Sequence, residues 1–108
     1  MGACTFATVA SGPSAKAAFD TAVAEAKAAY GSRYTGSIAE KDSFTVITIP
    51  YSFARSEPGP IPALAEVAMR YAQHLIETQD GRIDDKYGPA GAIDLGEGEW
   101  LFFGWASE

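Results

Sequence analysis

Hydrophobic positions recur along the chain at a spacing that marks two helices. Between Ser14 and Tyr30 apolar residues return every three or four positions, charged residues lie off that stripe, and Gly31 follows it. A second stripe of the same spacing predicts a helix that begins at Pro62 and ends near Thr78. The chain therefore contains two amphipathic helices, and each must cover an apolar surface.

Short stretches rich in aromatic and β-branched residues predict the strands. The first, residues 4–10, ends before the turn at residues 12–13. Two hairpins are predicted after it, one from strands 34–40 and 44–51 and one within 90–107. The order β-α-β-β-α-β-β predicts an α+β fold, with both helices on one face of a roughly five-stranded antiparallel or mixed sheet.

The last predicted strand is apolar on both of its faces. Successive side chains of a strand point to opposite faces. Here Trp100 and Phe102 point one way, while Leu101, Phe103 and Trp105 point the other. If both helices lie on one face of the sheet, the other apolar face needs a different cover.

The sequence leaves three possibilities for what covers this second apolar face. The Pro-rich loop 53–62 or the charged loop 80–90 can fold over the sheet, a ligand can fill a groove, or a second copy can pack sheet to sheet. The last alternative predicts a homo-oligomer with an interface built from Val46, Trp100 and Phe102.

Composition narrows the class of protein. The chain has 108 residues, of which 47% are hydrophobic, so we expect one globular domain over 1–108. Its net charge is −6 and its eight Lys and Arg residues are scattered, which argues against direct nucleic-acid binding. The single cysteine, Cys4, favours a reducing cytosol. No segment has the roughly 18 apolar residues of a membrane span, so we expect a cytoplasmic protein that does not contact membranes.

Few side chains suggest catalysis or a cofactor. Cys4 and His74, the only soft metal ligands, lie on different predicted elements, so no metal site is expected. Nucleophile elbows, P-loops and dinucleotide fingerprints are absent from the sequence, so no cofactor and no catalytic residues are assigned. A small enzyme that uses Asp84, Asp85 and His74 stays an alternative.

Two segments, YTGSIAEK at 34–41 and DDKYGPAG at 84–91, each combine tyrosine, glycine and lysine. Glycines allow backbone N–H groups to approach a ligand, and lysine and tyrosine can hold an anion or a ring. Glycine turns that need a positive φ would explain the pattern equally well. The candidate ligand-binding residues are Tyr34, Thr35, Gly36, Lys41, Asp84, Lys86 and Tyr87.

The stretches MGACTF, SAKAAFDTAVAEA, YTGSIAEKDSF and DDKYGPAGAIDLGEGEWLFFGWAS resemble a family of small uncharacterised proteins common in tailed-bacteriophage genomes. The resemblance covers nearly the whole chain except its Pro-rich middle. It implies a cytoplasmic accessory protein that acts on host defence or metabolism by binding, and it brings no catalytic residues.

These observations together predict a non-enzymatic, oligomeric binding protein. One concrete version sequesters a small anionic or nucleotide ligand made by a host defence system. The main alternative is an acidic inhibitor that occupies the nucleic-acid-binding surface of a host enzyme.

Overall fold

The computed structural model describes residues 2–31, 36–54 and 63–107. Within them the fold is α+β, with two long helices and a four-stranded mixed sheet in the order β-α-β-α-β-β. The elements are β1 (Ala3–Ser11), α1 (Ala15–Tyr30), the 3₁₀ turn η1 (Ile38–Glu40), β2 (Phe44–Val46), the single turn α2 (Tyr51–Ala54), α3 (Leu64–Glu77), β3 (Ala90–Gly96) and β4 (Glu99–Ser107).

Local signals decide where α1 begins and ends. The Ser14 hydroxyl accepts a hydrogen bond from the backbone N–H of Ala17 at 3.1 Å, which satisfies a free donor of the first turn. Gly31 ends the helix with a φ of +91°, and its N–H bonds to the carbonyl of Lys27. This predicted helix is confirmed. The second is confirmed from Leu64 onward, and Pro62 lies outside the described residues.

The sheet has the strand order β1-β4-β3-β2. β4 pairs antiparallel with both β1 and β3, whereas β2 pairs parallel with β3. The predicted hairpin near the C-terminus is confirmed as β3 and β4. Its turn contains Glu97 and Gly98, both with positive φ, at 54° and 81°.

The other predicted hairpin, from 34–40 and 44–51, is wrong. Residues 34 and 35 lie outside the described chain, and Ile38–Glu40 form a 3₁₀ turn because the Ser37 hydroxyl caps the N–H of Ala39. The strand that follows is only three residues long and pairs with β3. Within the described residues the sheet therefore has four strands rather than five.

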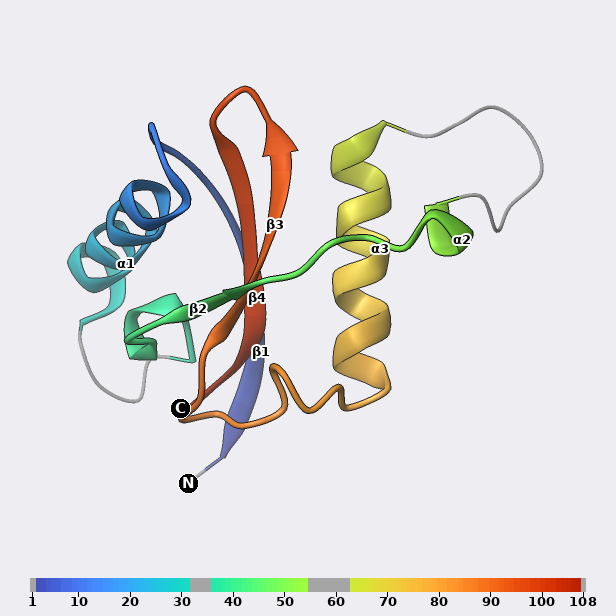
Figure 1. Ribbon diagram of the computed structural model, residues 1–108. Helices are drawn as coiled ribbons and strands as arrows, with labels where there is room; N and C mark the ends of the chain where they lie inside the picture. The colour runs from blue at the N-terminus through green and yellow to red at the C-terminus, as the bar shows by residue number, and fades with distance from the viewer. Residues whose placement is uncertain (1, 32–35, 55–62, 108) are drawn as a thin grey trace.

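The two helices lie on opposite faces of the sheet, not on one face as the sequence suggested (Figure 1). β1, β2 and β3 run parallel to one another, and β4 runs against them. The connection through α1 crosses the sheet from β1 to β2, and the connection through α3 returns from β2 to β3. Crossovers between parallel strands are right-handed, so two crossovers in opposite directions place their helices on opposite faces.

This arrangement explains why β4 is apolar on both faces. Phe102 packs under α1 in a ring cluster with Phe19 and Phe44, whose centroids lie 5.1 to 5.9 Å apart. Leu101 and Phe103 pack under α3 on the other face. Each helix covers one face, so an uncovered face no longer requires a second copy. Formation of a homo-oligomer stays a prediction.

Of the two loops expected to cover the sheet, the loop 80–90 lies within the described residues and helps to cover the face under α3. Residues 55–62 of the Pro-rich segment lie outside the described chain. The loop 80–90 contributes Ile83, which is 1% exposed, to the core beneath α3. Among the described helices, none is long and apolar enough to cross a membrane.

Candidate functional site

The two predicted ligand segments meet at one end of the sheet, where β2 and β3 begin. Lys41 stands just before β2, and its ammonium group donates to the backbone carbonyls of Asp85, Lys86 and Gly88 at 3.2, 3.1 and 2.9 Å. Tyr34 and Thr35 lie outside the described residues, and Gly36 donates its N–H to the carbonyl of Ser107 at 2.8 Å. The segments predicted as two separate sites form a single junction.

The Lys41 ammonium has a structural role at this junction. The residue is 3% exposed, and three carbonyls accept the three hydrogens that an ammonium can donate. Burial lowers the pKa of Lys41, and the nearby carboxylates of Asp85 and Glu40 partly oppose that shift. Since its donors are already used, Lys41 is poorly placed to hold an anionic ligand.

The remaining predicted ligand residues lie on the surface of the same loop. Tyr87 is 70% exposed, and the Lys86 ammonium lies 5.2 Å from the centroid of its ring. Asp84 is exposed, and the Asp85 carboxylate accepts the N–H of Tyr87 at 2.8 Å, which tightens the turn. Ligand contact by Asp84, Lys86 and Tyr87 stays a prediction.

The alternative catalytic residues belong to different elements. His74 lies on α3 near the rings of Phe53 and Tyr71, at centroid distances of 5.6 and 6.2 Å. Asp84 and Asp85 belong to the loop before β3. In the described part of the chain, no three His, Cys, Asp or Glu side chains lie close enough to hold a metal ion.

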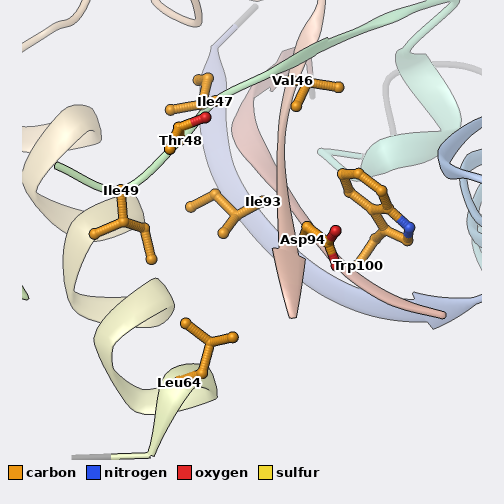
Figure 2. A pocket seen from close by; sticks show the side chains of 8 residues that line it. All are labelled: Val46, Ile47, Thr48, Ile49, Leu64, Ile93, Asp94 and Trp100. Atoms are coloured by element: carbon orange, nitrogen blue, oxygen red, sulfur yellow. The ribbon is translucent and has the colours of Figure 1, made fainter. Parts of the chain in front are cut away.

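A cavity of about 360 Å³ lies at the other end of β2 and β3, toward their carboxyl ends. We call it the edge groove. Figure 2 shows Ile49, Ile93 and Leu64 on the α3 side of the groove and Trp100 across from them. The lining residues are Val46, Ile47, Thr48, Ile49, Leu64, Ile93, Asp94 and Trp100.

The edge groove forms because β2 stops pairing before β3 ends. The last bond between them runs from the Ile47 N–H to the Ala92 carbonyl, at 2.8 Å. The chain then reaches Pro50, which has no N–H for a sheet ladder, while β3 continues to Gly96. Alternate residues of β3 face β2, so the backbone N–H and C=O of Asp94 point to the space that β2 has left. The pairing of β2 with β3 ends at Ala92, so β2 has no residue that pairs with Asp94.

The chemistry of the edge groove is mainly apolar, with acidic and neutral polar groups. Of its eight lining residues, Asp94 carries the only charge and Thr48 the only hydroxyl. The Asp94 carboxylate accepts the N–H of Gly96 at 2.8 Å, which holds it at the end of β3. In sheets with parallel strands and helices on both faces, ligands bind beyond the carboxyl ends of the strands, which is where this groove lies.

A second cavity of about 340 Å³ lies beside α1, above the junction at Lys41. Lys27 and Lys41 line it together with Asp20 and Asp42. The two acidic side chains balance the two basic ones, so this cavity has no excess positive charge for an anion.

The predicted interface residues divide between the surface and the core. Val46 is 56% exposed and Trp100 is half-buried, and both line the edge groove. Phe102 is 0% exposed beneath α1, so its assignment to an interface is wrong. In the sequence, apolar side chains point to both faces of the segment 44–51 and Pro50 lies near its end, but this pattern does not reveal that Leu64 and Asp94 join the groove.

Comparison with models of protein families, with curated protein sequences and with solved structures finds no match to this chain. The resemblance to the bacteriophage family therefore stays a prediction. Function must be inferred from the geometry of the site.

Proposed function

We propose that this protein is a non-enzymatic binding protein that recognises an extended segment of a partner protein at the edge groove. The observation that carries the proposal is the end of β3, where the backbone N–H and C=O of Asp94 face an apolar cavity without a partner strand. A peptide supplies both of the things that are missing there, a backbone to pair with and a side chain to fill the cavity.

An extended peptide fits these groups better than a small apolar molecule does. In the register of β2 the backbone groups of Val46 face outward, away from β3, so the end of β2 also offers a donor and an acceptor. An apolar molecule in the groove would remove water from such groups without replacing its hydrogen bonds, which costs about 1–3 kcal/mol for each group. A peptide backbone can replace those bonds.

Charge narrows the chemistry of the partner further. Asp94 is the charged group of the groove, and the chain carries a net charge of −6. A segment with an apolar anchor beside a Lys or Arg side chain complements both. A nucleotide or another small anion, which the sequence suggested, meets a carboxylate at this groove and a fully bonded lysine at the Lys41 junction.

Selection from a random peptide library displayed on phage tests the proposal. We expect the wild-type protein to enrich peptides that share an apolar residue next to Lys or Arg, and titration calorimetry with a synthetic consensus peptide then gives the affinity. Leu64→Asp, which puts a second carboxylate into the groove, should weaken binding by about tenfold or more. The matched control is Met69→Asp, on an exposed position of the same helix that does not line the groove.

Two results would overturn the proposal. One is a selection that yields no shared pattern, and the other is a consensus peptide that binds Leu64→Asp and Met69→Asp equally well. The salt dependence separates this function from the acidic inhibitor, because capture of an apolar anchor should weaken only modestly with added salt, whereas binding through net charge should weaken steeply.

A further inference from the structure

The two edges of the sheet differ in length and in sequence. The edge strand β2 has three residues and lies between charged residues and Pro50. The opposite edge strand, β1, has nine residues, and its register against β4 runs from Ala3 to Ser11 without a shift. β1 is thus the long, regular edge of this sheet.

The outer side of β1 presents a row of free backbone groups. The N–H of Gly12, just after β1, donates to the carbonyl of Gly98 in the turn before β4. The even-numbered residues of β1 therefore direct their backbone groups toward β4. The odd-numbered residues of β1 therefore direct their N–H and C=O groups away from β4, and β1 has no second partner strand in the described sheet. These residues are Ala3, Thr5, Ala7, Val9 and Ser11, and all five are exposed.

Sheet proteins that stay monomeric protect such an edge with a lysine, a proline, a bulge or an inward-pointing charge. The sequence ACTFATVAS of β1 has no charged residue and no proline, and its unbroken register excludes a bulge. The side chains on its exposed face are small, and Val9 is 50% exposed. Nothing in β1 opposes pairing with another strand.

We propose that two copies of this chain pair β1 with β1, antiparallel across a two-fold axis, so that one sheet runs through both copies. In the full-length register Ala7 lies on the axis opposite its counterpart, Thr5 faces Val9, and Ala3 faces Ser11. Each of these pairs consists of outward-facing residues, so each exchanges two N–H to C=O bonds. A two-fold axis perpendicular to the sheet keeps α3 of both copies on the same face.

A second copy suits this edge better than an unrelated strand, because the charged groups that flank the two ends of β1 are opposite in sign and approach each other when two copies pair antiparallel. Lys86 lies near the start of β1, where its ammonium is 3.4 Å from the Gly2 carbonyl, and Glu99 lies opposite Ser11 at the other end. Antiparallel pairing brings the basic end of one copy toward the acidic end of the other. The strand itself is uncharged, so the net charge of −6 is not concentrated at the contact.

Mass-resolved size-exclusion chromatography from about 1 to about 100 µM tests the proposal. We expect the wild-type protein to approach twice its chain mass of 11.4 kDa as the concentration rises. Ala7→Lys places two lysines opposite each other on the axis and should raise the dimer dissociation constant about tenfold or more. Val46→Lys, which adds the same charge at the other edge, should leave it unchanged. The double variant Thr5→Lys with Val9→Glu should still dimerise, since it forms two opposite-charge pairs across the axis.

Hydrogen exchange provides a second readout that does not depend on any variant. The N–H groups of Thr5, Ala7 and Val9 should gain protection as the wild-type concentration increases. A monomer at all concentrations overturns the proposal, and so does equal weakening by Ala7→Lys and Val46→Lys. Peptide binding at the edge groove should survive Ala7→Lys, so failure of the dimer and failure of the proposed function can be told apart.

Discussion

The two ends of the parallel strand pair β2 and β3 are built in opposite ways. At the amino ends, the Lys41 ammonium satisfies three carbonyls of the loop 84–88 and is itself almost completely buried. At the carboxyl ends, β2 leaves β3 and the backbone of Asp94 faces a cavity. Polar groups at one end have partners within the chain, and at the other end we propose that they receive a segment of a partner protein.

This difference separates stability from binding. A satisfied buried network holds the strands in register and costs several kcal/mol to break, whereas an exposed apolar groove contributes little to the fold. We call the amino ends of β2 and β3, where the polar groups have partners, the closed end. The lysine and glycines that suggested a ligand site in the sequence belong to it. We therefore expect substitutions at the amino ends to affect unfolding, and substitutions at the groove to affect binding.

The largest effect is expected from Lys41→Met. The substitution keeps the length of the side chain but leaves three carbonyls without a donor, so the free energy of unfolding should fall by about 2–3 kcal/mol. Urea denaturation measures it. Lys86→Met is the matched control, because its ammonium makes one long hydrogen bond of 3.4 Å to the Gly2 carbonyl and lies 5.2 Å from the exposed ring of Tyr87, so the substitution should change the free energy of unfolding by less than about 0.5 kcal/mol. Equal effects of the two variants would show that the junction is not the closed end described here.

Gly91→Ala should come next, with a loss of about 2 kcal/mol in the free energy of unfolding. A Cβ at this position in β3 would lie 2.5 Å from the Phe103 ring, which has no space to move within the core. Gly81→Ala is the control, because a Cβ there meets nothing within 4 Å. If thermal unfolding shows that both variants are tolerated, ring packing does not explain the glycine.

At the groove, Leu64→Ala should change the free energy of unfolding by less than about 0.5 kcal/mol, since the residue is 49% exposed. The same variant should measurably weaken the binding of the consensus peptide, as titration calorimetry would show. A large loss of stability together with unchanged peptide binding would contradict the prediction that the groove contributes to binding rather than to the fold.

The last prediction is an effect seen only at low pH, and it concerns the ion pair in the turn after α3. Hydrogen bonds from the Arg82 guanidinium, and then from its backbone N–H, lower the pKa of Asp80 from 3.8 to about 2. Between these two values the unfolded chain takes up a proton that the folded chain does not, so stability should fall as the pH drops from 3.8 toward about 2.

NMR titration of the Asp80 carboxyl group checks the value directly. Arg82→Gln should return its pKa toward 3.8, and Asp80→Asn should remove this part of the acid sensitivity. A normal pKa in the wild-type protein would contradict the expected pairing.

The sequence was sufficient for elements whose signals are local. The cap at Ser14, the terminator at Gly31 and the glycine turn between β3 and β4 all act within a few residues, and the structure has each of them. The strand β1 was also predicted from its own aromatic and β-branched residues, and the structure has it. For the candidate site, the sequence drew attention to the segments 34–41 and 84–91, and the structure shows the Lys41 junction between their described parts. Contact of Asp84, Lys86 and Tyr87 with a ligand stays a prediction.

The errors concern pairing over long distances. Nothing near β2 reveals that its partner is β3, and a short polar turn beside it looked like a hairpin. The edge groove was missed for the same reason, because Leu64 begins one helix while Asp94 and Trp100 lie on two later strands. Only their packing brings them together.

By itself, the sequence determined the two amphipathic helices, most of the strands and the unusual apolarity of β4 on both sides, since hydrophobic spacing, caps and turn residues are properties of neighbouring positions. The tertiary structure alone decided that each helix covers its own face, that Lys41 closes one end of the sheet and that β2 stops pairing before β3 ends at the other. Those features depend on strand order and on the direction of two crossovers, which follow from contacts between residues far apart in the chain.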